Sequence, residues 1–286
     1  MNLIESVFEI SKSFMEDPKY VSLNNDEIHV LCNDLKVLKK PEFPIPQENN
    51  ILKGVLLELV AASINYCYWY GKFNVRPLNA NSTKMYELLV NAFFDYDGKN
   101  NYWFRRCINR YYNSLVVHRF PLLKERKDHL YELMEKGEDF SEYVINNYEK
   151  KSINELMIEL ITLFPGFGED IFLKRASLFF LQLNRRFGWF KDQLNDLHVP
   201  ADYQVPKMLR YSKCIEYSQE LSNKISDNEL IPKHSQIECE IRSATILAVK
   251  KICHLSGWNV AEVDAFFFLN RHICDDAFHQ TITSDY

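Results

Sequence analysis

Residues 152–188, SINELMIELITLFPGFGEDIFLKRASLFFLQLNRRFG, contain two apolar helical patterns on either side of a glycine-rich break. Ser152 and Glu155 fit a capping box at the start of the first helix. The break is Pro165-Gly-Phe-Gly168, and the second pattern stops at Gly188, a residue type that commonly ends helices. The stretch therefore predicts two helices joined by a sharp turn.

Helical spacing of apolar residues continues along most of the chain, and we expect roughly ten helices in all. Besides the two above, we expect them at residues 3–15, 51–70, 85–94, 103–117, 121–136, from about 205, at 238–255 and at 260–272. We expect Gly71 and Gly137 to end two of these helices, and Pro41–Pro46 to form an extended connector. The predicted fold class is all-α, with residues 1–286 forming one domain whose first 50 residues are peripheral.

The helix–turn–helix around position 166 resembles the helix-hairpin-helix element of base-excision DNA glycosylases. An ordinary corner between two helices, punctuated by glycine, explains the same pattern. Both interpretations stay open at this level.

The net charge and the cysteine content bear on the binding partners and on the cellular compartment of this protein. The net charge is −5, whereas proteins that grip duplex nucleic acid usually carry a basic balance, so we expect no stable nucleic-acid complex. Seven cysteines without a Cys-x-x-Cys pair indicate a reducing compartment, and the first residues lack the basic and apolar regions of a signal peptide. Glu58 and Asn65 interrupt the most apolar stretch, so we expect no membrane span and a cytoplasmic protein.

Known cofactor and metal motifs are not evident in the sequence. His272, Cys274 and His279 lie near Asp275 and Asp276, but their spacing matches no standard zinc site. Phosphate-binding loops, dinucleotide fingerprints and nucleophile elbows do not occur. We therefore expect neither a metal nor a cofactor.

Two segments combine residue types that suit a binding site. The aromatic rings of Asn65-Tyr-Cys-Tyr-Trp69 could stack on a planar base while Asn65 bonds the edge of that base, although core filling is the commoner explanation of such aromatics. Lys174 and Arg175 lie inside an apolar helix, which indicates the edge of a cavity or, alternatively, side chains that reach the surface.

Two further segments hold carboxylates. Asp202 lies on a proline-bracketed connection just before a helix, where a capping aspartate is the simple explanation. Ser235 and Glu238 fit a second capping box, and Glu238 and Arg242 have the spacing of an ion pair along a helix. Structure alone explains these patterns, so the residues by themselves assign no activity.

Taken together and in this order, the segments resemble the queuosine salvage protein family. That family carries the blocks Asn-Phe-x-Phe-Trp, Phe-Tyr-Lys-Arg-Ala-Gln, Phe-Ala-Asp-Tyr-Arg-x-Pro-Gln, Glu-x-Glu-Ile-Arg-Gly and Phe-His-Arg-x-Arg-x-x-Tyr-Tyr. Here the blocks read NYCYW at 65–69, FLKRAS at 172–177, VPADYQVP at 199–206, ECEIRS at 238–243 and FHQTITSDY at 278–286. The resemblance covers about position 50 to the end.

The resemblance implies a fold similar to helix-hairpin-helix DNA glycosylases and an N-glycosidase that acts on a small molecule. The expected reaction hydrolyses the C1′–N bond of queuosine 5′-phosphate or queuosine and releases queuine for the salvage of a tRNA modification. Asp202 is the expected catalytic carboxylate, with Lys174 beside it or on the ribose-phosphate side. The expected substrate-binding residues are Asn65, Tyr66, Trp69, Arg175, Tyr203, Glu238, Glu240, Arg242, Asp264 and His279.

The chain also departs from the family pattern. Ala62 and Gln182 stand where the family usually has aspartates, and Gln280 and Ile282 stand where it has arginines. If those arginines hold the 5′-phosphate, this chain should accept the dephosphorylated nucleoside more readily. The alternatives are a glycosylase that acts on a base within DNA or RNA, and a helical binding protein without activity.

Overall fold

The computed structural model describes residues 2–45, 48–70, 80–96 and 101–286. Backbone contacts divide the chain into two compact units, Met1–Pro44 with Lys191–Ile282, and Ile45–Phe190 with Thr283–Tyr286. We call them unit 1 and unit 2, and describe each by itself.

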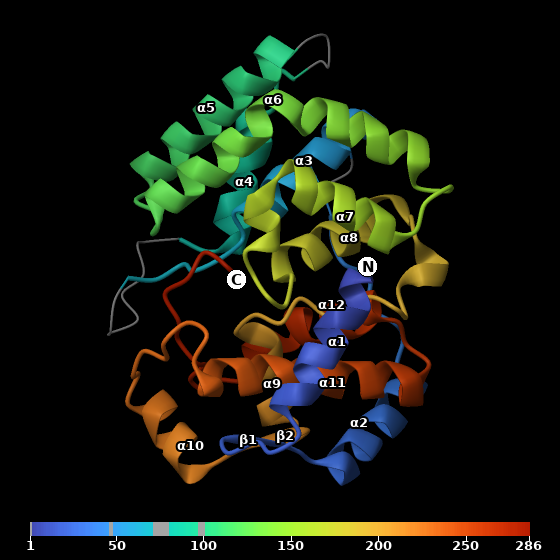
Figure 1. Ribbon diagram of the computed structural model, residues 1–286, viewed down its shortest axis with the longest axis vertical. Coiled ribbons are helices and arrows are strands. Elements are labelled where there is room, and N and C mark those ends of the chain that lie inside the picture. Colours follow the sequence, from blue (N-terminus) through green and yellow to red (C-terminus); the bar gives the residue numbers. More distant parts are fainter. Residues whose placement is uncertain (1, 46–47, 71–79, 97–100) are drawn as a thin grey trace. The chain divides into compact units, whose positions relative to one another are not determined.

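Within the described residues the chain forms twelve α-helices and one pair of three-residue strands (Figure 1). The predicted all-α fold class is therefore confirmed. Two helices were not expected from the sequence, namely α2 (Asn25–Val37) and α10 (Gln219–Ser226). Similarity to helix-hairpin-helix glycosylases stays a prediction.

Unit 1 is built around α11 (Gln236–Ser256), which is largely buried and is contacted by most other elements of the unit (Figure 1). Ser235 accepts the backbone N–H of Glu238 at its start, and Gly257 ends it in the left-handed conformation, with φ of 75°. The other elements of unit 1 are α1 (Leu3–Phe14), β1 (Val21–Leu23), α2, a 3₁₀ helix (Lys191–Gln193), α9 (Gln204–Tyr211), β2 (Ile215–Tyr217), α10, α12 (Val260–Asn270) and a 3₁₀ helix (Arg271–Ile273).

Strands β1 and β2 pair antiparallel, with Val21 opposite Tyr217. The carboxylate of Glu240, buried on α11, accepts the backbone N–H groups of Lys19, Tyr20 and Val21. This carboxylate therefore fixes the approach to β1 against the central helix of unit 1.

Unit 2 contains a bundle in which α3 packs on α6 and α8, while α5 packs on α4 and α6 (Figure 1). Its elements are α3 (Ile51–Ser63), α4 (Ser82–Ala92), α5 (Asn101–Val117), α6 (Leu123–Asn147), α7 (Ile153–Leu163), a 3₁₀ helix (Pro165–Gly168) and α8 (Lys174–Phe187). The capping box of Ser152 and Glu155 is confirmed, as is the end of α8 at Gly188, whose φ is 73°.

Two predicted helix ends are wrong. Helix α3 ends at Ser63 instead of Tyr70, because the carbonyl oxygens that follow are bound by side chains from other helices; Gly71 lies outside the described residues. Helix α6 continues through Gly137, where a Cβ atom would lie 2.8 Å from Cε1 of Phe104 on α5. Gly137 therefore serves close helix packing and not helix termination.

Two further findings concern membrane-spanning helices and cysteines. No helix in the described ranges is long and apolar enough to cross a bilayer. All seven cysteines are free thiols, and six of them are buried.

Candidate active site

The aromatic segment 65–69 follows α3 as irregular backbone, and the guanidinium group of Arg126 on α6 holds it. Nη2 of Arg126 donates to the carbonyl oxygens of Tyr66 and Cys67, each at 2.7 Å, and Nη1 donates to that of Ile64. Nε donates to the carbonyl oxygen of Pro121 at 2.7 Å. Arg126 is fully buried, so these bonds satisfy carbonyl groups that water does not reach.

Two more cations bind neighbouring carbonyl groups. Nη1 of Arg175 donates to the carbonyl oxygen of Ser63 at 2.7 Å, and Nζ of Lys174 donates to that of Asn65. Together with Arg126, three cationic side chains thus bind the five successive carbonyl groups of residues 63–67. The backbone of this segment is held by charge-assisted hydrogen bonds, which are stronger than neutral ones.

Tyr66 is enclosed by the same groups. The Cζ atoms of Arg126 and Arg175 lie 4.5 and 5.5 Å from the centroid of its ring, and its hydroxyl group lies 3.1 Å from Nδ1 of His129. Only 1% of Tyr66 is exposed. A ring covered in this way has a structural role in unit 2, and its predicted stacking on a base stays a prediction.

His129 has one tautomer that suits its neighbours. Nη1 of Arg175 lies 3.1 Å from Nδ1 and can only donate, so Nδ1 is the acceptor and Nε2 carries the proton. Nε2 lies 3.5 Å from Oε2 of the exposed Glu169. Burial lowers the pKa of His129 to about 3, and the charge of Arg175 adds to this shift, so the ring is neutral.

Lys174 and Arg175 begin α8 and are both buried, with 2% and 1% of their surface exposed. The alternative prediction, that the side chains of Lys174 and Arg175 reach the surface, is therefore wrong. Asp170 precedes them, and its carboxylate accepts the backbone N–H groups of Phe172 and Lys174. This carboxylate stabilises the start of the helix that presents both cations.

In unit 1, Asp202 lies at the start of α9 and is half-buried. Its Oδ1 accepts the backbone N–H of Gln204 at 2.7 Å and that of Val205 at 3.4 Å. Asp202 thus has the capping role that the sequence allowed, and these hydrogen bonds fix the direction of its carboxylate. The ring of Tyr203 packs against Phe278, with centroids 4.7 Å apart.

A buried ion pair supports this loop. Nη1 of Arg242 lies 3.2 Å from Oε1 of Glu238, and Nε of Arg242 donates to the carbonyl oxygen of Ala201 at 3.0 Å. The predicted pair along α11 is confirmed, whereas the second half of the predicted capping box is wrong: the Glu238 carboxylate accepts the N–H of His234 and turns to Arg242. Arg242 therefore joins α11 to the residue before Asp202.

Three other predicted residues also lie in unit 1. His279 is buried, and burial followed by the charge of Arg242 lowers its pKa to about 3. Asp264 lies on α12 and is buried, and Glu240 holds the backbone before β1. Asn65, Tyr66, Trp69, Lys174 and Arg175 all belong to unit 2, so the predicted residues divide between the two units.

The sequence profile of the queuosine salvage protein family matches residues 55–263. The chain belongs to this family. The matched range starts in unit 2, ends in unit 1 and includes every predicted site residue except Asp264 and His279.

Individual relatives of the family agree with this assignment. A protein of Dictyostelium discoideum named queuosine 5′-phosphate N-glycosylase/hydrolase is 35% identical over 125 residues, covering 39% of this chain and 38% of the relative. A protein of the same name from Schizosaccharomyces pombe is 29% identical over 184 residues, covering 55% and 50%. One from Sphaerobacter thermophilus is 34% identical over 110 residues, covering 34% of each. The chain thus spans half or less of the length of these relatives.

Arg126 and His129 were missed by the sequence analysis. Arg126 stands in the charged run Lys124–Asp128, which is typical of a solvated helix face. The available signal was helical spacing, because Arg126 and His129 share the buried face of α6 with Leu130, Leu133, Gly137 and Phe140.

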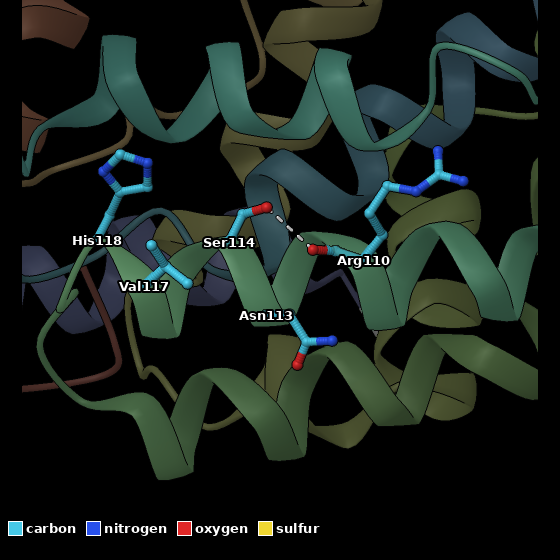
Figure 2. A pocket seen from close by; sticks show the side chains of 5 residues that line it. All are labelled: Arg110, Asn113, Ser114, Val117 and His118. Carbon is cyan, nitrogen blue, oxygen red and sulfur yellow. Dashed lines mark hydrogen bonds between the residues drawn. The ribbon is translucent and has the colours of Figure 1, made fainter.

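A surface hollow also lies on unit 2, along α5. Its lining comes from Arg110, Asn113, Ser114, Val117 and His118, and Ser114 donates to the carbonyl oxygen of Arg110 at 3.0 Å (Figure 2). These are not predicted site residues, and Arg110 is already paired with Asp95 at 2.8 Å. The hollow therefore carries no argument about the chemistry.

Proposed function

We propose that this protein is an N-glycosidase that hydrolyses the C1′–N bond of queuosine 5′-phosphate, or of queuosine, and releases queuine. The observation that supports it most directly is the family match over residues 55–263, together with the names of the relatives. The match includes the buried Lys174 and the oriented Asp202, the residue types that such a cleavage needs.

The reaction sets the requirements for the site. As the C1′–N bond breaks, positive charge builds on the ribose and negative charge on the departing base. Asp202 stabilises the ribose cation and accepts a proton from the attacking water, whose oxygen forms the new bond to C1′. The base nitrogen takes up one proton, so the products are queuine and a ribose hydroxyl group.

Asp202 suits this role because its Oδ1 is bound by the backbone at the start of α9. An anchored carboxylate needs little reorganisation when charge develops nearby. Lys174 supplies a buried positive charge for the ribose-phosphate side of the substrate. We propose that residues 1–286 work as one functional domain.

The proposed substrate contacts are Asn65, Tyr66, Trp69 and Arg175 in unit 2 and Tyr203 in unit 1, with the base contacted by Asn65 and the aromatic rings beside it. Queuine also carries a cationic amine, which an acidic residue would bind. The acidic candidates for this contact are Glu238, Glu240 and Asp264, all of which are buried in unit 1. The other predicted contacts, His279 included, remain part of the proposal.

The substrate is a small molecule, and the proposal requires no cofactor, membrane or stable nucleic-acid complex. The odd number of cysteines supports a reducing compartment such as the cytoplasm.

The test is incubation of the purified protein with queuosine 5′-phosphate and with queuosine, followed by chromatography for free queuine. We expect release from at least one substrate, and comparable release from both if the loss of the two family arginines relaxes the phosphate requirement. No release from either would overturn the proposal and favour a helical binding protein.

A further inference from the structure

The side chain of Asn65 is held by its neighbour Tyr68. The hydroxyl group of Tyr68 donates to Oδ1 of Asn65 at 3.1 Å, and Tyr68 is buried, whereas Asn65 is half-buried. The same hydroxyl group lies 3.1 Å from Sδ of Met85. An amide oxygen is a much stronger acceptor than a thioether, so the phenolic proton belongs to Asn65.

The backbone around Asn65 leaves little other freedom. Lys174 binds its carbonyl oxygen, and Arg126 binds the carbonyl oxygens of Ile64 and Tyr66 on either side. The backbone N–H of Asn65 donates to the carbonyl oxygen of Ala62. What remains to be set is the rotation of the side-chain amide, which decides whether an oxygen or an NH₂ group faces a ligand.

The hydrogen bond from Tyr68 decides that rotation. With Oδ1 directed to the phenol, Nδ2 and its two hydrogens form the other end of the amide. Asn65 then presents a donor. A flipped amide would donate to the phenol oxygen and leave the phenolic proton to the weaker acceptor, Sδ of Met85, so it is disfavoured. The family block quoted above has phenylalanine at this place, so the hydroxyl group is a departure of this chain from that pattern.

We propose that Tyr68 determines base specificity by orienting Asn65 as a hydrogen-bond donor to the oxygen at position 6 of a guanine-like base, an inference that rests on the proposed function. Negative charge on the departing base collects in part on this oxygen, so the donor stabilises the leaving group. A base with an amino group at position 6 places hydrogens against the Asn65 donor and is rejected. Tyr68 is thus a positioning residue that acts through Asn65.

The test compares Tyr68→Phe with the wild-type protein on 7-deazaguanosine 5′-phosphate and 7-deazaadenosine 5′-phosphate, using kcat/KM for base release. The variant keeps the ring and removes only the hydroxyl group. We expect the preference for the 6-oxo over the 6-amino substrate to fall by roughly five- to tenfold, as for the loss of one orienting hydrogen bond. Tyr111→Phe is the matched control, because Tyr111 is fully buried in the same unit and donates to the carbonyl oxygen of Met85.

A second variant keeps the inference testable if Tyr68→Phe does not fold. Asn65→Asp replaces the donor with an acceptor, and we expect it to reduce release from the 6-oxo substrate more than release from the 6-amino substrate. Equal losses on both substrates would show that the hydrogen bond only stiffens the segment, and would overturn the inference. Failure of the wild-type protein to release queuine, 7-deazaguanine or 7-deazaadenine would instead overturn the proposed function and this inference with it.

Discussion

Arg126 contacts Tyr66 in two ways: its Cζ lies 4.5 Å from the centroid of the tyrosine ring, and its Nη2 donates a hydrogen bond to the tyrosine carbonyl oxygen at 2.7 Å. Helix α6 thereby holds a segment that precedes it by 60 positions in the chain. The segment after α3 adopts its irregular backbone because the guanidinium group of Arg126, on a helix distant in the sequence, binds its carbonyl groups.

Replacing this arginine should therefore destabilise unit 2. Arg126→Met leaves the buried carbonyl groups of Ile64, Tyr66 and Cys67 without their donor, and we expect a loss of about 3–5 kcal/mol in the free energy of unfolding. Denaturant unfolding measures it. Arg106→Met is the control, since Arg106 is exposed above the ring of Trp103 and should cost less than about 1 kcal/mol.

Stability should fall as the solution is acidified below neutral pH. Burial lowers the pKa values of His129 and His279 to about 3, whereas an unfolded histidine titrates near ~6.5. Because the folded pKa is depressed, the stabilisation is complete above the unfolded pKa and is lost as pH falls from 6.5 towards 3. We expect each histidine to lower the free energy of unfolding by on the order of 2 kcal/mol between pH 7 and pH 5.

Denaturant unfolding at several pH values checks this expectation. His129→Gln should reduce the pH dependence of the free energy of unfolding by the contribution of one histidine, because glutamine does not titrate. A slope between pH 7 and pH 5 that is the same in wild type and variant would contradict a neutral, buried His129.

Gly137→Ala should destabilise the packing of α5 on α6. The added Cβ atom would lie 2.8 Å from Cε1 and 2.9 Å from Cζ of the buried Phe104, so the helices must shift. We expect a net loss of about 1–2 kcal/mol, because strain of about 1–3 kcal/mol outweighs the better helix propensity of alanine. Gly168→Ala is the control: its Cβ atom meets nothing closer than 3.4 Å and should be tolerated.

Lys174→Met should reduce catalysis more than it reduces folding. Methionine fills the space of the buried stem but removes the charge, and we expect kcat/KM for queuine release to drop by about a hundredfold. Lys150→Met, at an exposed lysine of the same unit, should behave as wild type. A folded Lys174→Met protein with unchanged kinetics would remove Lys174 from the proposed site.

The elements that the sequence predicted well are those with local signals. Ser152 and Glu155 start α7, and Gly188 ends α8, both through bonds or backbone conformations within a few residues. The end of α3 was missed because its cause is Arg126, more than sixty residues away. Gly137 was misassigned because its role depends on Phe104 of another helix.

The candidate site shows the same division. The pairing of Glu238 with Arg242 follows from helical spacing and was predicted. The sequence left open whether Lys174 is buried or reaches the surface, and the structure shows that it is buried. The bond from Tyr68 to Asn65 and the neutral His129 depend on side-chain contacts that no spacing rule encodes.

The most direct test of the account is queuine release by Asp202→Asn. Asparagine keeps a side-chain oxygen for the N–H groups of Gln204 and Val205, so helix α9 and the thermal stability should be preserved. Only the charge is lost, and we predict that release from queuosine 5′-phosphate falls by about a thousandfold in a protein that still binds the substrate. Release near the wild-type rate by this folded variant would contradict the central claim.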